Sequence, residues 1–144
     1  MKSQMGRAAD VIDILAAREL ANVLPDPVIL IDGYGAARYA NPAAIASFGT
    51  IRVGTLLQHR FRSPEMQQLL MNALRTKSSG EIEYSERVPI ERVFLISIQP
   101  LQSESGIFLV HFKDQSETRR IDRMRADFIA NASHELRTPL ASIS

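Results

Sequence analysis

The sequence predicts an α+β fold in which a single antiparallel sheet carries helices on one face. Two short strand patterns come first, several helical patterns follow, and three further strand patterns complete the compact part of the chain. Strands and helices that are segregated along a chain, instead of alternating, are typical of this class. The 144 residues, 45% hydrophobic and 23% charged, fit one globular domain with an appended helix.

The first half of the chain is predicted to supply an entry helix, a hairpin and the helical layer. Asp10 can cap the entry helix over residues 10–24, and Pro25 and Pro27 end it. Asn41 can then accept from free backbone N–H groups of a new helix, and a proline at position 42 loses nothing in its first turn. The apolar positions of the entry helix are Val11, Ile12, Leu15, Leu20, Val23 and Leu24. The elements expected next are strands over 28–31 and 36–40, a turn over 32–35, and helices over 42–48 and parts of 54–74.

The second half is predicted to form three antiparallel strands followed by one helix. The strand patterns cover residues 82–84, 93–98 and 107–112. Further on, Ile121, Met124 and Phe128 recur at intervals of three and then four residues, the spacing of a coiled-coil seam. We therefore expect the last helix to pair with a second copy of itself as a homodimer.

Composition excludes several classes of site and partner. Without cysteine, the chain cannot form disulfides, thiolate metal sites or sulfur-linked chromophores. A net charge of +1 provides no strong field for nucleic acid, so no nucleic-acid partner is predicted. The longest apolar run, residues 28–31, is far shorter than the roughly 18 residues of a membrane helix, which predicts a soluble piece. The last residues continue a helical pattern, so we expect a longer parent protein.

The most specific segment is FIANASHELRTPL, residues 128–140. It resembles the H-box of sensor histidine kinases along its whole length. The resemblance implies the start of the dimerisation and histidine-phosphotransfer domain, a homodimeric four-helix bundle in which His134 accepts the phosphoryl group. The next residues, ASIS at 141–144, most resemble the phosphate-regulon sensor branch of this family.

Helical geometry agrees with the role that the resemblance implies for His134. The apolar stripe centres near residues 128, 132 and 136, and His134 points about 160° away from it, toward solvent. The imidazole of a histidine has a ring nitrogen whose lone pair can attack a γ-phosphoryl group.

The resemblance also implies roles for three neighbours of His134. Glu135 would hydrogen-bond the other ring nitrogen or take its proton as a general base. Thr138, four residues after His134 and on nearly the same face, would position water for the phosphatase reaction. Pro139 cannot donate to the carbonyl of Glu135, so we expect the helix to bend just past the site.

Two other interpretations of His134 are weaker. A lone histidine on a helix is usually an ordinary surface residue, but here the surrounding motif favours the phospho-acceptor. His134 and Glu135 also begin the zinc-protease pattern HExxH. Thr138 occupies the place of the second histidine, so two ligands one turn apart are missing and no metal site is predicted.

The segment from about residue 20 to 113 resembles a PAS domain, the sensor fold that precedes this helix in such kinases. The resemblance rests on the strand over 28–32, the hairpin into residues 41–44 and the exit DQSE at 114–117. A PAS exit usually reads Asp-x-Thr. Here Ser116 replaces the threonine and keeps its hydroxyl, so Asp114 and Ser116 are expected to clamp the sheet to the outgoing helix.

No cofactor is expected in this chain, although a PAS core leaves room for an unidentified small-molecule ligand. His59 and His111 suggest haem as a possible ligand. However, His59 lies in a polar segment and His111 in an alternating strand, which favours surface or structural roles. An absorbance spectrum without a Soret band would exclude haem. Five rings are assigned to core packing: Phe48, Phe61, Phe94, Phe108 and Phe112. The basic run on the connecting helix is assigned to a solvated face: Arg119, Arg120, Arg123 and Arg125.

The resemblance implies a sensor portion of a two-component histidine kinase, with cytoplasmic location. A separate catalytic domain with ATP and Mg²⁺ would phosphorylate His134, and an aspartate of a response-regulator receiver domain would then accept the group. With no glycine-rich phosphate loop, the 144 residues should be inactive alone. The sequence leaves open whether segments upstream of this chain anchor the parent protein in the bacterial inner membrane. The alternative function is that of a non-catalytic PAS module for ligand sensing and dimerisation. The expected parts are an entry helix over 1–19, the PAS domain over 20–113, a connecting helix over 114–127 and the truncated phosphotransfer domain over 128–144.

Overall fold

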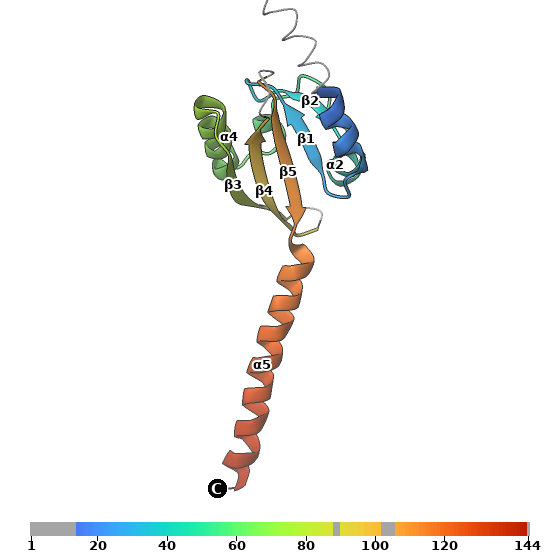
Figure 1. Ribbon diagram of the computed structural model, residues 1–144. Coiled ribbons are helices and arrows are strands. Elements are labelled where there is room, and N and C mark those ends of the chain that lie inside the picture. Colours follow the sequence, from blue (N-terminus) through green and yellow to red (C-terminus); the bar gives the residue numbers. More distant parts are fainter. Residues whose placement is uncertain (1–13, 88–89, 102–105, 144) are drawn as a thin grey trace, which may run out of the picture.

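The computed structural model describes residues 14–87, 90–101 and 106–143, and for residues 136–143 it describes the backbone alone. Five antiparallel strands form one sheet in the order β2-β1-β5-β4-β3 (Figure 1). Pairing of β1 with β5 joins the first hairpin to the last three strands. The elements are β1 (Val28–Ile31), β2 (Ala37–Ala40), α2 (Pro42–Phe48), α3 (Leu57–Arg60), α4 (Pro64–Thr76), β3 (Gly80–Glu86), β4 (Arg92–Pro100), β5 (Phe108–Asp114) and α5 (Ser116–Ile143).

The main core lies between one face of the sheet and the helices α2, α3 and α4. Ile29 and Ile31 of β1 point into it, because alternate residues of a strand face the same side. From α4 the buried side chains recur at helical spacing: Met66, Leu69, Leu70 and Ala73. The α+β fold predicted from the order of the sequence patterns is confirmed.

Phenylalanine rings fill the centre of this core. The ring of Phe48 lies 4.9 Å from that of Phe61 and 4.8 Å from that of Phe112, centroid to centroid. The rings of Phe61 and Phe112 are 5.0 Å apart. All five phenylalanines that were assigned to the core are buried, Phe94 and Phe108 included. Contacts at these distances are those of well-packed aromatic clusters.

A helix over residues 14–23 covers part of the opposite face of the sheet. It packs through Ala21, with Ile14 and Ala17, against a second cluster that contains Val28, Leu30 and Ile107. The apolar positions that predicted this helix are therefore not its packed face. Four of them are exposed, by 42% to 78%, namely Leu15, Leu20, Val23 and Leu24. The helix instead contacts the sheet through small alanine side chains. Three residues of the predicted helix lie outside the described residues, namely Asp10, Val11 and Ile12.

The side chain of Asn41, fully buried, ties three elements together. Its amide oxygen accepts from the backbone N–H groups of Val28 and Ala44, both at 2.9 Å. Its amide nitrogen donates to the carbonyls of Ala21 at 2.7 Å and Asp26 at 2.9 Å. The predicted cap of α2 is confirmed, and the same amide also holds the end of the N-terminal helix and the start of β1.

The 28-residue helix α5 follows β5 after a single residue, Gln115. Figure 1 shows it projecting away from the sheet, beyond the compact part of the molecule. Among the described residues, no helix combines the length and apolarity needed to cross a membrane.

Candidate functional site

His134 lies on α5 with its side chain exposed to solvent, as does Glu135. At 1.5 Å per residue, His134 stands about 27 Å along the helix from Ser116. The backbone is helical through Thr138 and Pro139, whose side chains lie outside the described residues. The expected roles of Thr138 and Pro139 therefore stay predictions.

The apolar stripe on the upper half of α5 is exposed. Ile121 is 45% exposed, Met124 63% and Phe128 73%, and the neighbouring Ile129 is 65% exposed. The first three of these are the side chains whose spacing predicted a coiled-coil seam. A large apolar side chain left in water forgoes about 1.5 to 3 kcal/mol of burial free energy.

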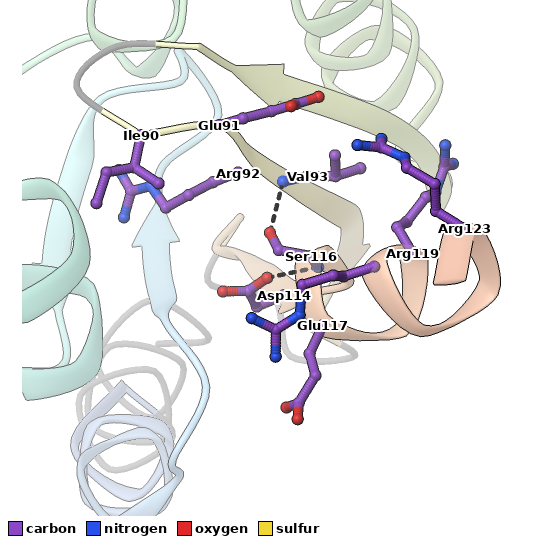
Figure 2. A pocket seen from close by; sticks show the side chains of 10 residues that line it. Ile90, Glu91, Arg92, Val93, Asp114, Ser116, Glu117, Arg119 and Arg123 are labelled. Carbon is purple, nitrogen blue, oxygen red and sulfur yellow. Dashed lines mark hydrogen bonds between the residues drawn. The ribbon is translucent and has the colours of Figure 1, made fainter. Parts of the chain in front are cut away.

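The junction between the sheet and α5 is held by three short hydrogen bonds, two of which are drawn in Figure 2. The Ser116 hydroxyl oxygen accepts from the Val93 N–H at 2.9 Å, and the Asp114 carboxylate accepts from the Ser116 N–H at 2.8 Å. The Gln115 N–H donates to the Val93 carbonyl at 2.7 Å. Ser116 thus joins the first turn of α5 to the start of β4, and Asp114 at the end of β5 caps that turn.

A cavity of about 660 Å³ lies beside this junction, between the start of β4 and the first turns of α5 (Figure 2). Its lining mixes charges, with Arg120 and Arg123 on α5 and Glu91 before β4. Arg119, which also lines it, forms an ion pair with Glu83 of β3. One arginine of the basic run therefore contacts the sheet, while the run as a whole is exposed.

The two histidines outside α5 lie on different elements and have different surroundings. His111 on β5 approaches Asp26, with its Nε2 atom 2.9 Å from the carboxylate Oδ2. His59 on α3 is exposed and lines a cavity of about 540 Å³ with Leu74 and Arg75. Among the described residues, no group of three or more His, Asp or Glu side chains is placed to hold a metal ion.

A charged cluster that the sequence patterns missed sits at the end of β3. The Glu86 carboxylate accepts from Arg92 at 2.6 Å and lies 3.7 Å from Arg60. The Tyr84 hydroxyl donates to it at 3.4 Å. Burial, and next the negative charge of Glu86, raise the pKa of Tyr84 above its usual value of 10.0. Glu86 and Arg92 are paired across β3 and β4, on either side of the loop that joins these strands. Opposite charges at such positions of the sequence were a signal that could have predicted this ion pair.

Comparison with protein families identifies the lower part of α5. Residues 124–144 match the model of the "His Kinase A (phospho-acceptor) domain". The matched segment includes His134, and it begins on the exposed stripe at Met124.

Curated relatives of this chain are sensor kinases. It is 25% identical over 126 residues to the sensor protein kinase WalK of Staphylococcus saprophyticus, and 28% identical over 143 residues to the sensory histidine kinase/phosphatase NtrB of Rhizobium leguminosarum. The sensor protein kinase FleS of Pseudomonas aeruginosa is 28% identical over 134 residues. The alignments cover 84%, 87% and 87% of this chain, but only 20%, 37% and 30% of those proteins.

Solved structures identify the fold of the upper part. The PAS domain of nitrogen regulation protein NR(II) from Vibrio parahaemolyticus covers 68% of this chain with a TM-score of 0.53 and 21% identity, and 96% of that domain is matched. The PAS domain of BvgS from Bordetella pertussis covers 83%, with a TM-score of 0.59, 16% identity and 98% of that domain matched. These likenesses establish a PAS fold. The chain thus combines a PAS fold with a segment that matches the phospho-acceptor domain, and it is similar to sensor kinases such as WalK and NtrB.

Proposed function

We propose that this chain is the sensing portion of a two-component histidine kinase whose PAS fold regulates phosphorylation of His134. The phosphoryl group comes from ATP and passes on to an aspartate of a response regulator. The observation that carries the proposal is the position of His134. It lies exposed within the segment that matches the phospho-acceptor family, on a helix that leaves the PAS sheet after one residue.

The chemistry assigned to His134 is a direct phosphoryl transfer. The lone pair of one ring nitrogen attacks the γ-phosphorus, the bond from phosphorus to the bridging oxygen breaks, and ADP leaves. The other ring nitrogen then carries excess positive charge, and Glu135 accepts its proton or stabilises it by a hydrogen bond. The adjacent, exposed carboxylate of Glu135 supports this role.

The remaining motif residues are assigned to the phosphatase reaction and to bending of α5. Thr138 positions water for the phosphatase reaction. Pro139 removes one backbone hydrogen bond and so weakens the helix just past the site. The phosphate-regulon branch remains a prediction from residues 141–144, because the sensor kinases named above are WalK, NtrB and FleS.

ATP and its Mg²⁺ are assigned to a catalytic domain of the parent protein. ATP and the response regulator both place this part of the parent in the cytoplasm, and an anchor in the bacterial inner membrane is compatible with it.

Phosphorylation of the full-length parent tests this proposal. With labelled ATP, the parent should acquire an acid-labile, base-stable label that maps to the peptide containing His134. The 144-residue chain alone should acquire none, because it must receive the group from a catalytic domain. A stable label on serine, threonine or tyrosine of the parent would contradict the proposal.

Dimerisation is a second candidate function, favoured by the exposed stripe of α5. Two copies that pair through Ile121, Met124 and Phe128 would bury side chains that are now 45% to 73% exposed. The spacing of these residues is that of a two-stranded coiled coil. A purely structural dimer would need no phosphoryl chemistry, so the test described above separates it from the kinase.

We expect Phe128→Glu to weaken self-association about tenfold or more, because it removes a burial free energy of about 1.5 to 3 kcal/mol. Sedimentation equilibrium of the 144-residue chain measures the change. Ala126→Glu introduces the same charge on nearly the opposite side of the helix and should leave the dissociation constant within about twofold. Equal weakening by both variants would exclude the predicted seam.

A further inference from the structure

We propose that Glu86 is a positioning residue, through which the helical layer of the PAS fold sets the geometry of the first turn of α5. Arg60 and Arg92 hold its carboxylate, and the three side chains form what we call the Glu86 clamp. The inference concerns the regulation of His134 and so rests on the proposed function.

The Glu86 clamp gathers two positive charges on one shielded carboxylate. The Glu86 side chain is only 13% exposed, with Arg92 Nη2 2.6 Å from its Oε2 atom and Arg60 Nη1 3.7 Å from its Oε1 atom. Arg92 is its direct partner in the β3–β4 register, and Arg60 comes from the end of α3. One carboxylate therefore connects the hairpin to the helical layer.

Both arginines also bind the end of α2. Arg92 donates to the Ser47 carbonyl at 2.8 Å, and Arg60 donates to the Phe48 carbonyl at 3.0 Å. The last carbonyls of a helix lack partners within it and carry partial negative charge, so cations are favoured there. The Glu86 clamp thus fixes the end of α2 against α3 and β4.

The guanidinium groups lie over the aromatic core. Arg60 is 5.6 Å from the ring centre of Phe48 and 4.9 Å from that of Phe61. Arg92 is 5.5 Å from Phe48 and 5.3 Å from Phe94. These are cation–π distances. Any change in the packing of these rings, such as one caused by a ligand between sheet and helices, therefore moves the guanidinium groups.

The Glu86 clamp reaches α5 through one peptide. Arg92 is followed directly by Val93, whose N–H and carbonyl make the two hydrogen bonds to Ser116 and Gln115. Figure 2 shows Arg92 and Val93 side by side at the start of β4, with Val93 turned to Ser116. Because the N–H of Val93 belongs to the peptide that starts at Arg92, a rotation of the Arg92 backbone reorients the donor that holds α5.

The ion pairs of this cluster contribute less to stability than their short distances suggest. Desolvating charged groups offsets much of their attraction, and buried ion pairs are often worth no more than apolar side chains of the same size. What the geometry does provide is one arrangement of α2, α3 and β4 relative to the clamped turn of α5. That is the property a transmitting element needs.

The test compares Glu86→Gln with Glu81→Gln in the full-length parent. Gln keeps the size of Glu86 but cannot balance two guanidinium groups, so we expect the steady-state level of phosphorylated His134 to change about fivefold or more. Glu81, exposed on the same strand, loses the same charge and should change that level less than twofold. Arg92→Lys, which keeps the charge but cannot bond both Glu86 and Ser47, should change the level in the same direction as Glu86→Gln.

A second measurement reports the helix directly. The 144 residues contain no cysteine, so spin labels on Glu65→Cys in α4 and Asp127→Cys in α5 give the distance between sensor and helix. Glu86→Gln should shift or broaden this distance distribution, while Glu81→Gln should not. A folded Glu86→Gln protein with unchanged distances and unchanged phosphorylation overturns the inference. If the wild-type parent does not phosphorylate His134 at all, the proposed function fails. Unchanged distances in Glu86→Gln would then separately overturn the positioning role of Glu86.

Discussion

Replacing His134 with glutamine is expected to reduce phosphorylation of the parent protein by ATP to background. Glutamine has about the length of histidine and can occupy the same exposed position on α5. Its side-chain nitrogen has no available lone pair, so no bond to the γ-phosphorus can form. Phosphohistidine analysis of the purified variant, incubated with labelled ATP, measures the loss.

The other two histidines supply matched controls for this experiment. His59→Gln changes an exposed residue of α3, and His111→Gln changes the partner of Asp26 on β5. Neither lies on the phospho-acceptor helix, so both variants should retain the label. If His134→Gln keeps more than a small fraction of the label, or if one of the controls loses it, the phospho-acceptor has been misassigned.

Asn41→Ala is expected to lower the free energy of unfolding by about 3 to 5 kcal/mol, one of the largest losses available to a single polar side chain here. The fully buried amide makes four hydrogen bonds, to Ala21, Asp26, Val28 and Ala44. Alanine leaves their backbone groups without these partners and removes the cap of α2, which alone is worth about 1 kcal/mol. Urea unfolding followed by circular dichroism measures the change.

Asn72→Ala is the control for this loss. Asn72 is exposed in α4, where alanine is the better helix former, so stability should stay within about 0.5 kcal/mol of the wild type. A loss below about 1 kcal/mol for Asn41→Ala would show that water replaces the amide, and that Asn41 is a local cap only.

The order of strands and helices could be predicted because each pattern is local. Alternation along β4 and the proline after Asn41 depend on neighbours in sequence, and the structure follows them closely. The packed face of the N-terminal helix could not be predicted in this way. Its contacts use Ala17 and Ala21 against the far side of β1, and small side chains give little signal in an apolar periodicity.

The same distinction separates the two parts of the site. The motif around His134 is one continuous segment, so its meaning could be seen in the sequence. The Glu86 clamp joins side chains from α3, β3 and β4 with carbonyls of α2. Only the folded sheet brings these groups together, and the pairing of Glu86 with Arg92 was the one local hint.

The single residue between β5 and α5 turns the helix into a lever arm. Because only Gln115 separates β5 from α5, a tilt of β5 is transmitted to the whole helix. It therefore moves the imidazole of His134, about 27 Å along the helix. A tilt of about 5° would displace that ring by roughly 2 Å over this length, comparable to the difference between a productive and an unproductive approach to a nucleotide. A stimulus too weak to rearrange the sheet could therefore still switch the chemistry at the far end.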